Sequence, residues 1–152
     1  MLKLRKNKKG FTLVELIVVI AIMAVLAGTV AGVTVSQLNK QTDNANKTQA
    51  KKVADYIASL IIEGDIYIST SGANDGKFML KGATSAADEL LSPTNLKTEV
   101  DKEFPSVIAA SAGKGNITLA VAATGDSITV TYTHKGSGGP TNYTINKEGV
   151  IQ

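Results

Sequence analysis

The sequence contains no cysteine and a single histidine, so several kinds of chemistry are excluded at once. Without cysteine, no disulfide, thiolate metal site, thiol nucleophile or lipid-modified cysteine can form anywhere in the chain. His134 ends a predicted strand with no acidic residue near it in sequence, and we expect it to lie at the surface. Cysteine usage gives no indication of the redox compartment.

Acidic residues are absent from the first ten positions, and basic residues are concentrated there. Five of the sixteen Lys and Arg residues lie in this stretch: Lys3, Arg5, Lys6, Lys8 and Lys9. They account for the formal net charge of +3, because without them eleven basic residues face thirteen acidic ones. The rest of the chain is thus slightly acidic, which argues against a basic surface for nucleic acid. We expect no nucleic-acid partner for the folded domain.

A long apolar run follows the basic stretch. Between Phe11 and Val35 the only ionisable residue is Glu15, and roughly 20 apolar residues suffice to cross a bilayer as a helix. Basic residues before the run predict that the N-terminus stays in the cytoplasm and that everything after Lys40 faces outward. We therefore expect residues 11–35 to form a transmembrane helix of a single-pass membrane protein.

Proline and glycine are absent from residues 36–63, so the helix is predicted to continue beyond the membrane. Apolar residues recur there with helical spacing, which predicts an amphipathic half packed on a domain, with Gly64 ending it. These apolar positions are Ala50, Val53, Ala54, Ile57 and Ile61. In the same stretch, Lys40, Lys47, Lys51 and Lys52 are set against Asp43 and Asp55, which we interpret as a solvated helix face.

Residues 65–152 change to the period-two pattern of strands, with short helices in between. We predict helices at 85–91 and 93–103, N-capped by Ser85 and Ser92. Strands are predicted at 65–70, 77–80, 116–123, 127–134, 142–146 and 150–152. Short turns favour an antiparallel meander of three or four strands, covered by Val53, Ile57 and Ile61 of the helix. The predicted class is α+β, with a globular head formed by residues 65–152.

The junction between the basic stretch and the apolar run has a specific pattern: Gly10, then Phe11-Thr12-Leu13-Val14-Glu15. This pattern closely resembles the class III signal of type IV pilins and related pseudopilins. The resemblance covers about a quarter of the chain. It implies that residues 1–10 are a leader peptide, that a prepilin peptidase cuts between Gly10 and Phe11, and that the new amine of Phe11 is methylated.

The resemblance further implies a structural subunit that polymerises with other pilin subunits, helped by an assembly ATPase and platform protein, into a cell-surface filament for adhesion, motility or biofilm formation. Glu15 would then neutralise the amine of Phe11 on a neighbouring subunit. The alternative is that Glu15 only stabilises the N-terminus of its own helix. Many relatives carry a proline in the anchor helix, where this sequence has Gly28 and Gly32 instead.

Two other functions share parts of this pattern. A pseudopilin of a type II secretion or DNA-uptake system would carry the same signal. A secreted binding protein with an ordinary signal peptide would be cut after Ala27, although Glu15 interrupts the apolar region that such a signal needs. Asn74-Asp75-Gly76 is interpreted as a turn rather than a calcium loop. We identify no catalytic residue, metal ligand or cofactor site, and expect no enzyme activity.

Overall fold

The computed structural model describes residues 10–82 and 87–152. The predicted helix at 85–91 therefore falls partly outside the described residues, as do its proposed cap Ser85 and the leader residues before Gly10. The chain divides into two compact units: one ends at Leu38, and the other runs from Asn39 to Gln152. From here on we call the second unit the head; it includes residues 39–64 in addition to the predicted 65–152.

Helix α1 runs from Leu13 to Glu63, continuously through Gly28 and Gly32. The predicted long helix is thus confirmed, and it ends where the sequence indicates. Gly64 adopts φ +84°, a conformation that glycine reaches without steric cost. The amide of Asp65 donates to the carbonyl of Leu60 at 3.0 Å, and that of Gly64 donates to Ile61 at 3.3 Å. This pair of bonds is a Schellman motif, which satisfies carbonyls at the helix end.

A small sheet follows α1. Strands β1 (Ile66–Ile68), β2 (Phe78–Leu80) and β3 (Glu89–Leu90) pair antiparallel in the order β1-β2-β3. A 3-10 turn, η1 (Gly72–Asn74), lies between β1 and β2, so the predicted turn is confirmed. The predicted helix at 85–91 is wrong for its described part. Leu91 donates its amide to Phe78 at 2.9 Å and is buried, because pairing with β2 gives this short segment both hydrogen bonds and a core position.

Helix α2 (Pro93–Glu103) confirms the second predicted helix and its cap. The Ser92 hydroxyl accepts from the amide of Asn95, and the Asn95 side chain accepts from the amide of Ser92 at 2.7 Å. Pro93 occupies the first helical turn, where its missing N–H costs nothing. Leu96 and Val100 face the core from this helix. Local capping therefore determines where α2 begins, and two apolar positions determine which face it buries.

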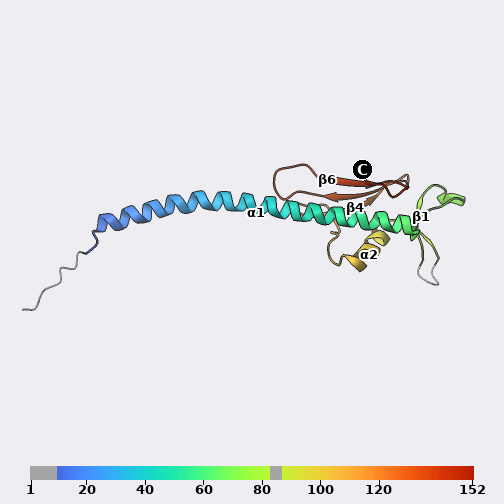
Figure 1. Ribbon diagram of the computed structural model, residues 1–152, viewed down its shortest axis with the longest axis horizontal. Helices are drawn as coiled ribbons and strands as arrows, with labels where there is room; N and C mark the ends of the chain where they lie inside the picture. Colours follow the sequence, from blue (N-terminus) through green and yellow to red (C-terminus); the bar gives the residue numbers. More distant parts are fainter. Residues whose placement is uncertain (1–9, 83–86) are drawn as a thin grey trace, which may run out of the picture. The chain divides into compact units, whose positions relative to one another are not determined.

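A second sheet contains β4 (Ile117–Val121), β5 (Ile128–Tyr132) and β6 (Thr141–Ile145), antiparallel in the order β4-β5-β6. The predicted C-terminal meander is confirmed, although its strands are shorter than expected. The segment 150–152 forms a bridge between Ile151 and Ile145 rather than a full strand. In the head, this sheet and α2 lie on different sides of α1 (Figure 1). The head is an α+β fold with two sheets, where the sequence predicted one.

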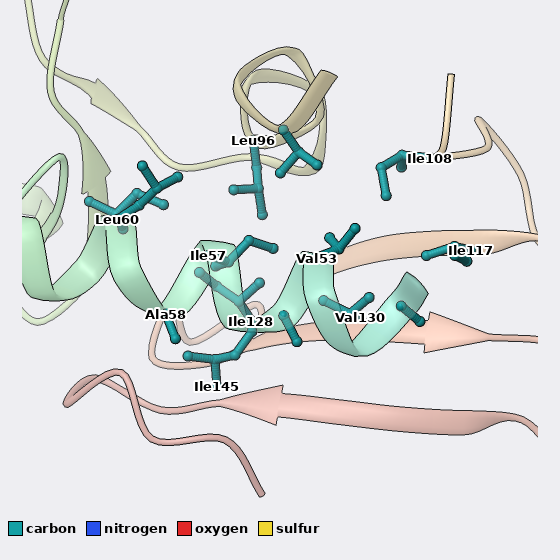
Figure 2. Packing of buried hydrophobic residues seen from close by; sticks show 14 of the residues in the cluster. Val53, Ile57, Ala58, Leu60, Leu96, Ile108, Ile117, Ile128, Val130 and Ile145 are labelled. Carbon is teal, nitrogen blue, oxygen red and sulfur yellow. The ribbon is translucent and has the colours of Figure 1, made fainter. Parts of the chain in front are cut away.

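The core of the head lies where α1 meets the second sheet and α2. Val53 and Ile57 are fully buried and lie between the sheet residues Ile128 and Val130 and the α2 residue Leu96 (Figure 2). Ile61, which was predicted to cover the sheet, is only partly buried, while the neighbouring Leu60 is buried. Burying side chains of this size contributes roughly 1.5 to 3 kcal/mol each. Helix-on-sheet packing is therefore the main stabilisation of the head.

Candidate processing and assembly site

The bond between Gly10 and Phe11 lies just before α1, in a segment without regular secondary structure. Both residues are exposed, and Phe11 exposes 88% of its side chain. Among residues 10–82 and 87–152, no atom lies within 4 Å of a Cβ placed on Gly10. A peptidase needs such an accessible, non-helical bond. Both residues of the predicted cleavage position are thus exposed and lie outside the helix.

The first turn of α1 is capped by two side chains. The Thr12 hydroxyl accepts from the amide of Glu15 at 3.3 Å, and the Glu15 carboxylate accepts from the amide of Thr12 at 2.8 Å. The Thr12 hydroxyl also donates to the Glu15 carboxylate at 3.0 Å. This reciprocal arrangement is a capping box. The sequence contains the pattern of this motif, Thr12-x-x-Glu15, but the sequence-based prediction did not include a capping box here.

The capping box gives Glu15 a local partner within its own chain. It supports the alternative in which Glu15 stabilises its own helix, and it shows where the carboxylate points before any subunit contact forms. Because Glu15 lies one turn into the helix, its carboxylate reaches back to Thr12, next to Phe11. A neighbouring amine could approach the same carboxylate, since a carboxylate has several acceptor positions.

The apolar half of α1 is exposed along its whole length. Its large apolar side chains from Leu13 to Leu38 each expose between 45% and 73% of their surface. Exposed apolar patches of this extent mark membrane or protein interaction sites in soluble domains. Among the described residues, α1 is long and apolar enough to cross a membrane. This half of the helix requires a lipid or protein environment, as the sequence predicted.

A second cluster, absent from the sequence prediction, centres on Asp43 in the head. Asp43 was assigned to a solvated face, but it is 8% exposed and holds the loop after β5 against α1. Its carboxylate accepts from the Tyr132 hydroxyl at 2.6 Å and from the amides of Lys135 at 2.7 Å and Gly136 at 3.1 Å. The Tyr132 bond, followed by the Lys135 amide, holds the pKa of Asp43 below its ordinary value. We call these residues the Asp43 cluster.

His134 belongs to the same region and corrects a second prediction. Its side chain is only 21% exposed, because its ring lies close to both α1 and β6. Nε2 is 2.8 Å from the Thr141 hydroxyl, and Nδ1 is 3.9 Å from the Asp43 carboxylate. Asp43 lies 91 residues before His134, so nothing in the sequence indicated this contact, whereas Thr141 is only seven residues away. The Asp43 cluster is a structural junction within the head, where it joins α1 to the loop after β5.

Comparison with known proteins agrees with the geometry of the N-terminal segment. No curated protein and no solved structure matches the chain. The family model described as the prokaryotic N-terminal methylation motif matches residues 5–31. This range contains Gly10, Phe11, the capping box and most of the exposed apolar half of α1. The chain therefore carries the class III signal, consistent with a type IV pilin or pseudopilin precursor whose processing and polymerisation the motif implies.

Proposed function

We propose that the chain is the precursor of a type IV pilus subunit. The observation that carries the proposal is the methylation motif over residues 5–31, joined to an apolar helix whose large side chains are exposed. Prepilin peptidase cuts between Gly10 and Phe11 and methylates the new amine of Phe11. The apolar half of α1 holds the subunit in the cytoplasmic membrane, with the head outside. An assembly ATPase and platform protein then add subunits to a surface filament.

Intact-mass analysis and N-terminal sequencing of the mature protein from its native host test the processing step. We expect a chain that begins at Phe11 and carries one additional methyl group. A mature chain beginning at Gly28 would indicate an ordinary signal peptide and overturn the proposal. A chain that keeps Met1 would indicate a plain membrane anchor.

Glu15 is proposed to pair with the Phe11 amine of a neighbouring subunit in the filament. Removing a carboxylate from the edge of a membrane leaves that amine without a counter-charge, which is costly in an apolar environment. The capping box complicates the obvious Ala variant, because Glu15→Ala removes the local cap as well as the charge. Glu15→Gln separates the two roles, since Gln can also serve at this position of a capping box but carries no charge.

We expect Glu15→Gln to be cleaved and inserted normally but to give few filaments. Thr12→Val is the matched control: it removes the hydroxyl of the capping box and keeps the Glu15 charge. This variant should assemble at close to normal yield. Normal filament yield from Glu15→Gln would refute the pairing and leave Glu15 with its local capping role. Loss of assembly in Thr12→Val alone would place the cap itself in the assembly step.

A pseudopilin would pass the same processing test, so the destination of the mature protein must be measured separately. We propose a pilus because Glu15 suits a subunit that adds within a filament. Antibody labelling of filaments sheared from intact cells tests this choice. Surface filaments built from this chain support a pilus, whereas a defect in protein secretion or DNA uptake on deletion, without filaments, would favour a pseudopilin.

A further inference from the structure

Charge in the head is separated along α1. We call the end where α1 enters the head at Asn39 the entry end, and the end where α1 stops at Glu63 the far end. The entry end carries four lysines against one buried acid, Asp43. The far end carries seven acids against three lysines. The net charge of the head is close to zero, but its two ends carry charges of opposite sign.

The entry end is built around the first turns of α1 in the head. Its lysines are all exposed: Lys40, Lys47, Lys114 and Lys135. The loop after β5 is held there by Asp43, which accepts from the amide of Lys135. The loop before β4 is held by Asn46, whose side chain donates to the carbonyl of Gly115 at 3.5 Å. The net charge of this end is +3 with His134 neutral.

The far end gathers the turns that surround the C-terminus of α1. Contacts on the chain place them together: Lys81 donates its amide to the carbonyl of Asp65 at 2.8 Å, and Phe78 donates to Gly125 at 2.9 Å. Gly149 lies against the carbonyl of Ala58. The seven acids are all exposed: Glu63, Asp65, Asp75, Asp88, Glu89, Asp126 and Glu148. With Lys77, Lys81 and Lys147 included, the net charge of this end is −4.

Two further features strengthen the separation. The last turn of α1 contains no basic residue, so the negative end of the helix dipole adds to the acidic far end. The middle of the head is neutral, because four lysines there face four acids. Three ion pairs account for most of these charges: Lys51 with Asp55, Lys97 with Asp101, and Lys102 with Glu99. The opposite signs are thus confined to the two ends.

We propose that the entry end of one head binds the far end of a second copy of this chain, and that this contact fixes the axial stagger between subunits. The proposal rests on the proposed function, in which all subunits leave the membrane in one orientation. Heads of equal orientation that lie side by side without stagger bring like charges together. A shift along the helix axis brings unlike ends together instead. Complementary charge of this kind sets orientation and register more than affinity.

A second copy is favoured over an anionic lipid surface because both halves of the contact are present on the same head. A lipid surface would explain the basic entry end but not the concentration of acids at the far end. Fields from these ends extend about 10 Å at ordinary ionic strength, which suffices to orient subunits as they approach. The partner that fits the far end is a basic protein surface, and the entry end provides one.

The test uses charge reversal in the full chain, expressed in the native host in place of the wild type. The entry-end variant is Lys47→Glu with Lys114→Glu, and the far-end variant is Asp75→Lys with Glu148→Lys. All four side chains are exposed. We expect both variants to be processed and inserted normally but to give about tenfold fewer filaments, because like charges then meet across the contact. A chain that combines all four substitutions should recover most of the filament yield.

A matched control changes the net charge by the same amount in the neutral middle of the head. Lys51→Glu with Lys52→Glu equals the entry-end variant in net charge and should assemble normally. End variants that assemble like the wild type, or a combined chain that fails to recover, would overturn the contact. If the combined chain fails to recover and the entry-end variant no longer binds anionic vesicles, the entry end would be assigned to lipid binding. If the wild type itself forms no filaments, it is the proposed function that fails.

Discussion

The hydroxyl of Tyr132 offers a direct measure of how firmly the Asp43 cluster holds the head together. Tyr132 is fully buried on β5, and its hydroxyl donates to the Asp43 carboxylate at 2.6 Å. Substitution of Tyr132 by Phe keeps the ring in the core and removes the hydroxyl, which is also hydrogen-bonded to the Asn46 side chain. A hydrogen bond to a charged group contributes about 1.5 to 3 kcal/mol. Tyr132→Phe should therefore lower the free energy of unfolding of the head by an amount in this range.

The corresponding change in melting temperature follows from the size of the unit. For a cooperative unit of roughly 110 residues, a loss of 1 kcal/mol lowers the melting temperature by about 4 °C. Tyr132→Phe should then melt about 6 to 12 °C below the wild type. The measurement is a thermal melt of the full chain in a mild non-ionic detergent, followed by near-ultraviolet circular dichroism of the tyrosines, which reports on the head and not on the apolar helix.

Tyr143 provides the matched control on the next strand. Its hydroxyl donates to the carbonyl of Lys47 at 3.4 Å, a long bond at the surface. Tyr143→Phe removes the same atom and should change the melting temperature by only a degree or two, since exposed weak bonds contribute little. Equal melting temperatures for Tyr132→Phe and the wild type would refute the reasoning. They would show that the amides of Lys135 and Gly136 hold the loop without the hydroxyl.

Three further predictions concern the head. Ile57→Ala should destabilise it by about 2 to 5 kcal/mol, and Ile62→Ala, on the same helix but 75% exposed, by much less; urea unfolding of both variants checks this. The lowered pKa of Asp43 means that its ionised form stabilises the head above about pH 4, and that this stabilisation is lost as the pH falls through the lowered pKa. Asp43→Asn should therefore be less stable at neutral pH but lose less on acidification, as urea midpoints at about pH 5 and pH 3 would show. Ser92→Ala removes the cap of α2 and should cost about 1 kcal/mol, measurable as a lower urea midpoint.

The parts of the fold predicted correctly are those determined by local patterns. The span of α1 followed from an apolar run, a stretch without proline or glycine and the stop at Gly64. The start of α2 followed from the cap at Ser92. β3 was missed because a segment of two paired residues has no period of its own, and its pairing with β2 depends on backbone partners rather than on side-chain pattern. The second sheet was not predicted for the same reason, because the pairing of these short strands leaves no side-chain pattern in the sequence.

In the candidate site, too, features set by local sequence patterns were predicted and features set by distant contacts were not. The proposed cleavage position at Gly10 and the apolar helix form a continuous pattern in the sequence. The role of Asp43 was not, because its partners Tyr132, Lys135 and Gly136 lie far along the chain. The local sequence, an acid flanked by lysines on a helix, indicates a solvent-exposed position. Only the fold shows that a loop closes over it.

The Asp43 cluster and the charge separation of the head are connected by position. Asp43 holds Lys135 and the loop that follows it at the entry end, through backbone bonds that leave the lysine side chain exposed. Its own negative charge offsets one of the four exposed positive charges around it. Replacing Asp43 should therefore disturb the entry end in two opposite ways, by releasing the loop and by removing a buried negative charge. The charge-reversal variants avoid this ambiguity, because they change exposed side chains alone.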